Sequence, residues 1–325
     1  MSAPSVVTSA PLLSDAERRE RLARLPTLVH APVGHVDVCV FDAHDDEALL
    51  IEVGRQRERC FRGIGGGTGH DFDLDDDDFG EGCYQQLVIV DRETQDLIGG
   101  CRFAVASRRH GRPLATEHMF AFDDAFRADI LPGVLDIGRM FIVPQHRARR
   151  QNALSLDHMF RGLAFVALDD EVQQFFGRVV FDKHTDPFVR DLTLAYLRHH
   201  FSGTGVQARH PEPMRLTSEP LGVDFTDDAK RDLRTILQAA RRRGGTIPAL
   251  VRAYVGMSPR LQVFDSAKDH DIGGIEEVCM LVHKHDISFR RGERWLRTRD
   301  GAVERPSPST SDKTPATSGE HHVAA

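Results

Sequence analysis

The segment from Leu135 to Leu163 combines an apolar strand that carries charges with a basic turn and an amphipathic helix. The strand contains Asp136 and Arg139, a proline ends it, and three arginines follow between Arg147 and Arg150. Charges in an apolar strand are costly unless they are paired or hydrated in a cleft. A helix N-terminus beside arginines suits an anion such as phosphate. Two interpretations remain open: a ligand-binding cleft, or a buried ion pair next to a solvated turn.

The strand geometry sets a condition on any shared site. Strict alternation places Asp136 and Arg139 on opposite faces of the strand. They can meet in one site only if a β-bulge lies between them, and Gly138 is a suitable position for that bulge.

The rest of the chain alternates between strand and helix periods, which predicts a mixed α/β fold. Hydrophobic residues make up 40% and charged residues 28% of the 325 positions, so wholesale disorder is excluded. Ser14 and Glu17 have the spacing of a capping box for a short N-terminal helix. The predicted strands cover residues 36–40, 87–90, 97–105, 134–143, 176–181, 261–264 and 278–282. The main predicted helices cover residues 45–61, 152–168, 187–200, 233–240 and 247–255.

Charge and hydropathy exclude several classes of protein. The net charge of -7 argues against a protein that coats nucleic acid. No apolar run approaches the roughly 18 to 20 residues that span a bilayer. The N-terminus lacks the order of a secretory signal, and the five cysteines form no Cys-x-x-Cys pair. We therefore expect a chain that stays inside the cell, without disulfides or a metal site.

Two conspicuous motifs have ordinary explanations. The glycine cluster at residues 63–69 lacks the Gly-Lys-Ser/Thr ending of a phosphate-binding loop, so a flexible connector is favoured. The aspartates at residues 71–78 lack the glycine and glutamate positions of a calcium-binding hand, which predicts a solvated acidic loop.

The charged strand and the segment after it resemble the acyl-donor motif of the GNAT superfamily. The closest resemblance is to the branch with L-ornithine N-alpha-acyltransferases, glycine-lipid acyltransferases and so-called putative haemolysins. That branch has an acid-x-Gly-Arg strand and then x-x-Val-x-Pro-x-x-Arg, matched here by Asp136, Gly138, Arg139, Val143, Pro144 and Arg147. Similar motifs occur in the same order at residues 61–69, 87–102, 185–187 and 247–254. The chain departs from the usual pattern at Asp136, Met140 and the pair Gln85-Gln86.

The resemblance implies a GNAT-like α/β fold, of the α+β type, whose mixed central sheet is flanked by helices. The sheet would splay between its fourth and fifth strands, near residues 141–143 and 176–180. We expect an N-terminal extension over residues 1–30, a GNAT-like domain over residues 31–290, and a disordered tail over residues 303–325. Within that domain, a C-terminal extension of helices and strands would begin near residue 221.

The implied activity is N-acyl transfer to the α-amine of an amino acid such as ornithine or glycine. A fatty acyl group, including the 3-hydroxy type, would come from an acyl carrier protein thioester and give a lyso-aminolipid. One alternative is an acetyl-CoA-dependent N-acetyltransferase of a small amine, and another is an inactive GNAT-like regulator that binds acyl carriers. The implied location is cytoplasmic, with an optional peripheral contact at the inner membrane face and no nucleic-acid partner.

The resemblance also implies roles for particular residues. Asp136 and Arg139 would be catalytic. The donor arm would bind at Phe141, Val143, Arg147, Arg149, Arg150 and Gln151, and the amino-acid acceptor at Arg102, His184 and Asp186. Acyl carrier protein, or coenzyme A, would bring the acyl group as a co-substrate, with no permanently bound cofactor and no metal.

Overall fold

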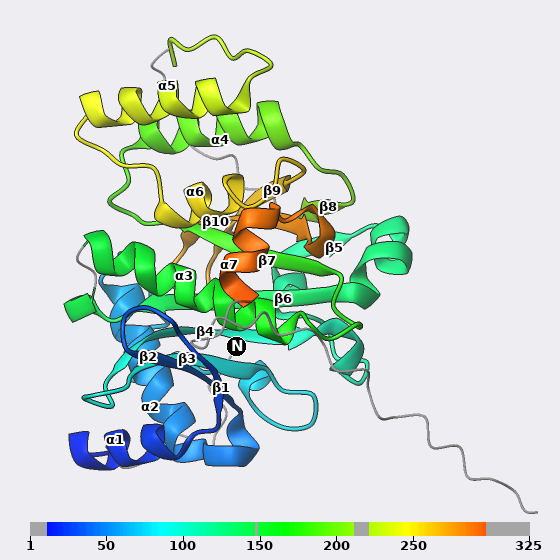
Figure 1. The fold of residues 1–325 in the computed structure, drawn as a ribbon. Coiled ribbons are helices and arrows are strands. Elements are labelled where there is room, and N and C mark those ends of the chain that lie inside the picture. The colour runs from blue at the N-terminus through cyan, green and yellow to red at the C-terminus, as the bar shows by residue number, and fades with distance from the viewer. Residues whose placement is uncertain (1–11, 147–148, 211–220, 297–325) are drawn as a thin grey trace, which may run out of the picture.

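An eight-stranded mixed sheet forms the centre of the molecule in the computed structural model, which describes residues 12–146, 149–210 and 221–296. Its strands follow the order β1-β2-β3-β4-β6-β7-β10-β9 (Figure 1). β6 and β7 are parallel, and the other neighbours in this sheet are antiparallel. A small second sheet pairs β5 with β8. The strands are β1 (Thr27–His30), β2 (Val36–Phe41), β3 (Gln85–Asp91), β4 (Leu97–Val105), β5 (Phe120–Phe122), β6 (Val134–Ile142), β7 (Gln174–Phe181), β8 (Val206–Ala208), β9 (Gln262–Asp269) and β10 (Ile275–His283).

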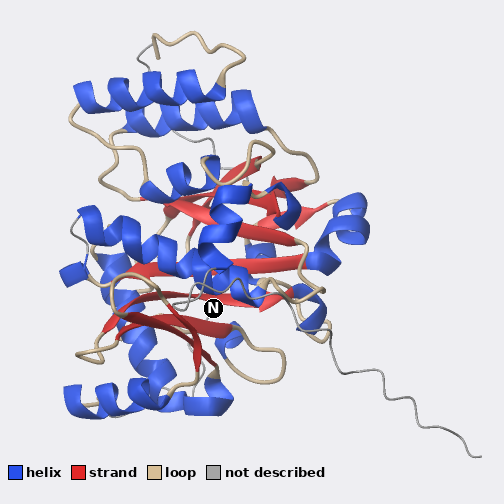
Figure 2. Ribbon diagram, in the orientation of Figure 1, coloured by secondary structure: helices blue, strands red, loops and turns tan. Residues whose placement is uncertain are grey.

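Helices cover both faces of the large sheet (Figure 2). Successive residues of β2 show the division, because Val38 belongs to the core that includes α3 and Cys39 to the core that includes α2. α5 packs on the outside of α4, at the top of Figure 1. The helices are α1 (Asp15–Arg24), α2 (Ala43–Arg62), α3 (Arg149–Val166), α4 (Pro187–Phe201), α5 (Ala229–Arg242), α6 (Ala249–Val255) and α7 (Phe289–Leu296).

Strong apolar periods predicted most of these elements, and the GNAT-like sheet flanked by helices is confirmed. The capping box is also present at α1, where Ser14 Oγ accepts the backbone N–H of Glu17. β1, β5, β8 and α7 are eight residues or shorter and show no clear period in the sequence. β1 lies within the N-terminal extension expected for residues 1–30, yet it forms one edge of the large sheet. The tail expected at residues 303–325 is outside the described residues.

Among the residues that the structure describes, no helix is both long and apolar enough to span a lipid bilayer.

Candidate active site

β6 and β7 separate after a short stretch of parallel pairing. They pair over residues 134–137 of β6 and 174–177 of β7, and the described structure records no pairing between them beyond that point. Both strands nevertheless continue, because β6 stays paired with β4 as far as Ile142 and β7 with β10 as far as Phe181. The opening expected between the fourth and fifth GNAT strands is therefore present, and it begins at Arg178.

A cavity of about 280 Å³ occupies this opening. Its walls come from both strands and from residues in or next to α2, α3 and α6, and most of them are apolar. Three charged residues, Arg139, Arg178 and Glu277, complete the lining. The apolar residues are Phe61, Ile64, Met140, Phe141, Ile142, Leu156, Val180, Pro248, Ala249 and Leu250. We call this space the gap cavity.

A β-bulge in β6 sets the direction of Arg139. Gly138 lies opposite Arg102 of β4, yet Phe141 lies opposite Gly100, so β6 holds one more residue than β4 between these pairs. Arg139 has a φ of 50°, a strained value for a residue with a side chain. The bulge was expected at Gly138, and the strained residue is its neighbour. The extra residue breaks the strand's alternation and turns Arg139 toward carboxylates on the α2 side.

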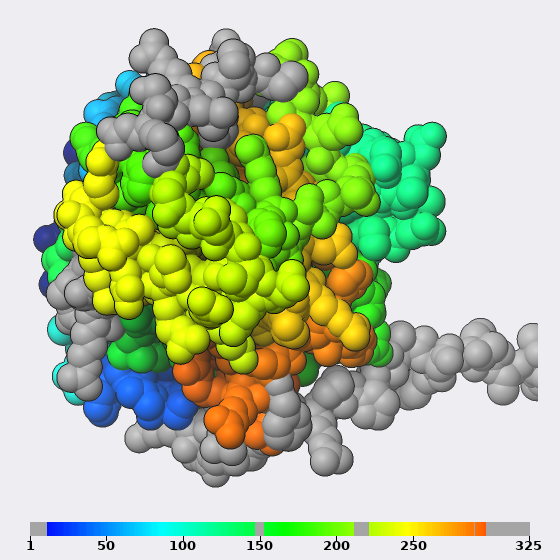
Figure 3. All heavy atoms as spheres, turned by 90° about the horizontal axis from the view of Figure 1, so that it is seen from above, coloured from blue at the N-terminus to red at the C-terminus, as the bar shows by residue number. Residues whose placement is uncertain are grey.

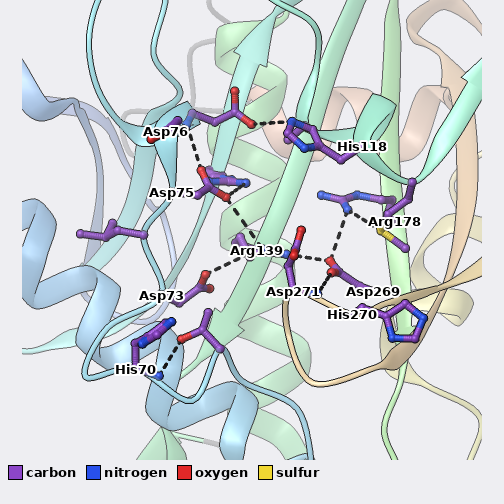
Figure 4. A pocket seen from close by; sticks show the side chains of 16 residues that line it. His70, Asp73, Asp75, Asp76, His118, Arg139, Arg178, Asp269, His270 and Asp271 are labelled. Carbon is purple, nitrogen blue, oxygen red and sulfur yellow. Dashed lines mark hydrogen bonds and ion pairs between the residues drawn. The ribbon is translucent and has the colours of Figure 1, made fainter. Parts of the chain in front are cut away.

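A second cavity, of about 250 Å³, adjoins the gap cavity, because Arg139 and Arg178 line both. Figure 4 shows both arginines among the residues that line this second cavity. It is enclosed by the loop after α2, by the short helical turn Ala115–His118, and by the turn between β9 and β10. We call it the charged cavity, because its other ionisable residues are His70, Asp73, Asp75, Asp76, Asp77, Arg102, His118, Asp269, His270 and Asp271.

Carboxylates hold the arginines of the charged cavity in place. Arg102 Nη1 lies 2.7 Å from Asp75 Oδ1 and 2.9 Å from Asp78 Oδ2. Arg139 donates to Asp269 Oδ2 at 3.2 Å (Figure 4). Burial alone would raise the pKa of Asp75, but the charges of Arg102, Arg139 and Arg57 and the hydrogen bonds from Arg102 together outweigh burial, and the pKa of Asp75 is lowered.

The acidic run at residues 71–78 is not the solvated loop that its composition predicts. Asp73 and Asp78 are 1% and 0% exposed. Arg57 Nη2 lies 3.1 Å from Asp78 Oδ2, and Arg139 Nε lies 3.2 Å from Asp73 Oδ1. Buried carboxylates are tolerated when cations pair with them, and here the cations come from α2, β4 and β6, which are distant in sequence.

Asp136 is fully buried and lines neither the gap cavity nor the charged cavity. Tyr84 Oη donates to Asp136 Oδ2 at 2.5 Å, and Thr116 Oγ1 donates to Oδ1 at 2.7 Å. Burial and the negative charge of Asp136 raise the pKa of Tyr84 well above its usual range, so the phenol stays a neutral donor. The catalytic role expected for Asp136 stays a prediction, while its contacts fix the positions of Tyr84 and Thr116.

Replacement of Asp136 by asparagine should therefore lower the free energy of unfolding. The amide turns one of the two acceptor oxygens into a donor, which then faces a hydroxyl group that is itself donating. A mispaired buried polar group costs about 1–3 kcal/mol. Urea unfolding of Asp136→Asn and wild type measures this difference, and equal midpoints and slopes would contradict the hydrogen-bonding account.

The residues expected to bind the donor arm fall in different places. Phe141 lines the gap cavity, whereas Val143 is buried in the core beside α2. Arg147 lies outside the described residues. Residues 149–151 form the start of α3, but their side chains are outside the described part of the structure. The predicted roles of these four residues in binding the donor stay predictions.

The residues expected to bind the acceptor do not come together. Arg102 lines the charged cavity, whereas His184 and Asp186 line a third cavity, of about 800 Å³. Asp186 is also the N-cap of α4, and it accepts the backbone N–H of Phe188 at 2.7 Å.

The third cavity adjoins the gap cavity and is rich in arginine. Ile64, Val180, Pro248 and Ala249 line both spaces. Exposed arginines from the end of α5, the loop after it and α6 line the third cavity, namely Arg241, Arg243 and Arg252. We call it the arginine groove. α5, in yellow, lies exposed across the face seen in Figure 3.

Arg178 and Glu277 belong to the gap cavity but were not singled out from the sequence. Arg178 lies in an apolar strand, at residues 175–181, so the signal that identified Asp136 and Arg139 was present there too. Glu277 directly precedes the apolar residues 278–282 and gives no comparable signal. The Arg178 Nη1 atom lies 3.0 Å from Glu277 Oε2, and both side chains are about 5% exposed or less.

The sheet, its opening and a family match define the class of this protein. Residues 56–156 match the family model described as an acetyltransferase (GNAT) domain. The match covers α2 from its middle, β3 to β6 and the start of α3, which include most of the walls of the opening. The class is that of GNAT acyltransferases.

Two curated relatives narrow the class to a family. A glycine N(alpha)-acyltransferase of Phocaeicola vulgatus is 30% identical over 265 residues, 78% of this chain and 81% of the relative. One of Bacteroides thetaiotaomicron is 32% identical over 283 residues, 82% of this chain and 84% of the relative. The chain belongs to the GNAT N-acyltransferase family that contains these two enzymes.

Solved structures add little to this assignment. The acyl-homoserine lactone synthase LasI is 12% identical, covers 77% of this chain and 90% of its own, and reaches a TM-score of 0.40. That score is too low for the properties of LasI to bear on this chain.

Proposed function

We propose that this N-acyltransferase moves a fatty acyl group from an acyl carrier protein thioester to the α-amine of an amino acid. The observation that carries the proposal is the meeting of two unlike cavities at Arg139 and Arg178. A mostly apolar space suits an acyl thioester, and a space lined by charges suits a zwitterionic amino acid. The product would be a lyso-aminolipid, and the two relatives' names favour glycine over ornithine as acceptor.

The separation of β6 from β7 supports a thioester on a pantetheine arm. Beyond residues 137 and 177, β6 and β7 no longer pair with each other. Backbone N–H and C=O groups that have lost a neighbouring strand can bind an extended ligand, as in β-strand addition. The amide groups of a pantetheine arm are donors and acceptors of the right kind. The arm would then lie along the gap cavity with its thioester near Arg139 and Arg178.

The arginines between the cavities support an acceptor that carries a carboxylate. A guanidinium group binds a planar carboxylate through parallel hydrogen bonds. Arg102 pairs with Asp75 and Asp78 and lines only the charged cavity, whereas Arg139 and Arg178 line both cavities and are the better candidates at the junction. Bound there, the α-amine of the acceptor lies between the carboxylate and the thioester.

The arginine groove supports an acidic carrier as the source of the thioester. It adjoins the gap cavity, and its three exposed arginines outnumber its two aspartates, Asp182 and Asp186, although the chain as a whole has a net charge of -7. A local basic surface can attract an acidic partner to an acidic protein and raise its association rate. Such a carrier would place the reaction in the cytoplasm, with release of the lipid product toward the inner membrane face.

Charge reversal in the arginine groove should weaken use of the carrier-bound donor. We expect the double change Arg241→Glu and Arg252→Glu to raise KM for acyl carrier protein about tenfold, with a smaller change in kcat. Arg231→Glu with Arg234→Glu is the matched control, because it changes the same charge on α5 outside the groove. Equal effects of both pairs, or an equal effect on an acyl-pantetheine donor, would exclude this groove as the carrier's docking surface.

Thiol release and product mass measured together test the activity itself. Purified protein is supplied with a 3-hydroxy fatty acyl group on acyl carrier protein or coenzyme A, or with acetyl-CoA, and with glycine or ornithine. We expect an N-acyl amino acid from the long-chain carrier thioester. Turnover with acetyl-CoA alone would indicate an N-acetyltransferase, and carrier binding without thiol release would indicate a regulator.

A further inference from the structure

Glu277 brings a carboxylate into the gap cavity from β10, a strand outside the β6–β7 pair. In register, Glu277 lies opposite Val180 of β7, two residues beyond Arg178 on the same face. Its side chain is 5% exposed and lines the gap cavity. Of the residues that line this cavity in the described structure, no other carries a carboxylate or an imidazole.

One ion pair places this carboxylate at the junction of the two cavities. Arg178 Nη1 lies 3.0 Å from Glu277 Oε2, while the same oxygen accepts no hydrogen bond from the described residues. Arg178 lines both cavities, and its Nη2 atom would lie 3.1 Å from a Cβ placed on Gly138. The guanidinium group therefore spans the start of the opening, and Glu277 lies beside it.

Acyl transfer to an amino acid requires a base at this junction. The acceptor arrives as an ammonium ion, which has no lone pair for attack on a thioester. Asp136 is sealed by Tyr84 and Thr116, and Asp73 and Asp269 are engaged by Arg139. These carboxylates are on the charged-cavity side or enclosed, whereas the Glu277 carboxylate faces the space assigned to the thioester.

We propose that Glu277 is the general base of the reaction, an inference that rests on the proposed function. Glu277 takes one proton from the acceptor's ammonium group, and the free amine forms a C–N bond with the thioester carbon. The C–S bond breaks, and the leaving sulfur takes a second proton from the same nitrogen. Glu277 then releases its proton to solvent. The balance is one amide, one thiol and one proton from one ammonium and one thioester.

The surroundings of Glu277 raise its affinity for a proton. Burial raises the pKa of Glu277, and the negative charge of Asp269 adds to the rise. Arg178 and Arg139 act in the opposite direction, and the more distant Asp136 raises the pKa further. These groups come from β7, β9 and β6, the strands that surround the site. The net upward shift brings the proton affinity of the carboxylate closer to that of an amine.

The pH dependence of turnover tests this assignment. In wild type, kcat/KM should fall as the pH falls through the raised pKa of Glu277, because a protonated base cannot accept a proton. Glu277→Gln should lower kcat about 100-fold or more and leave KM for the donor near its wild-type value. Its activity should rise with pH up to the pKa of the acceptor amine itself. Glu277→Asp keeps the carboxylate, so it should recover part of kcat and also the fall of kcat/KM at low pH.

Glu276→Gln is the matched control, since Glu276 lies on the other face of β10 and pairs with Arg190 at 3.0 Å. It should keep the wild-type pH profile. Thermal unfolding of each variant reports whether the sheet is intact, and Glu277→Asp keeps the buried charge if Glu277→Gln unfolds. If wild type is active and kcat of Glu277→Gln is within about threefold of the wild-type value, the role of Glu277 is overturned and the proposed function stands. The same holds if the fall of kcat/KM at low pH is unchanged in Glu277→Gln. Wild type that releases no thiol would overturn the proposed function as well.

Discussion

Ala249→Trp is expected to lower kcat/KM for a long-chain thioester about 100-fold while the protein stays folded. Ala249 begins α6 and lines both the gap cavity and the arginine groove, so its side chain stands where the two spaces meet. An indole at this position fills much of a cavity of about 280 Å³. Small displacements of reacting groups cost about 100-fold in rate, and a blocked entrance displaces the whole thioester.

Ala253→Trp is the matched control for Ala249→Trp. Ala253 lies one turn further along the same helix and lines a hollow beside α3 and α7, which shares Leu156 and Ala249 with the gap cavity but includes no residue of β6 or β7. We expect its kcat/KM to stay near the wild-type value, measured with the same thioester and acceptor. If both tryptophans reduce turnover alike while circular dichroism stays unchanged, the gap cavity is not the path of the acyl donor.

Arg102→Met is expected to lower the free energy of unfolding by about 3–5 kcal/mol, because it leaves buried carboxylates without their cation. Arg102 is 1% exposed, and its Nη1 atom contacts Asp75 at 2.7 Å and Asp78 at 2.9 Å. Methionine fills a similar space but cannot pair with either aspartate. The acceptor role first expected for Arg102 predicts instead a normal stability and a raised KM for the amino acid. Urea unfolding together with KM therefore separates the two roles.

A variant of an exposed arginine shows how much of the loss in unfolding free energy is due to burial of the ion pair. Arg108 pairs with Asp169 and Glu171, but its side chain is 55% exposed. Solvent screens such a pair, and its removal costs about 0–1 kcal/mol. Arg108→Met should therefore change the unfolding free energy much less than Arg102→Met. Similar losses in the two variants would mean that the buried network contributes no more than a surface ion pair.

The sequence predicted the site best where one short segment contains both the unusual residues and the structural feature that they indicate. The charged strand with Asp136 and Arg139 indicated a special place in the sheet, and the β6–β7 opening lies there. The need for a bulge followed from alternation, and the strained residue is Arg139, next to the glycine expected to hold it. The interpretation of residues 71–78 was wrong, because their arginine partners are between 16 and 66 positions away and no local pattern in the sequence indicates them.

By itself the amino-acid sequence determined the order of the long helices and strands, since their periods of apolar residues persist over enough positions to be read locally. It also identified β6 as a strand that carries charge into the sheet. Only the tertiary structure decided which charges share a space: it enclosed Asp136 between two hydroxyl groups, separated His184 and Asp186 from Arg102, and brought Glu277 of β10 to Arg178. Strand order and register determine which side chains meet. Both depend on backbone hydrogen bonds between segments that are far apart in the chain.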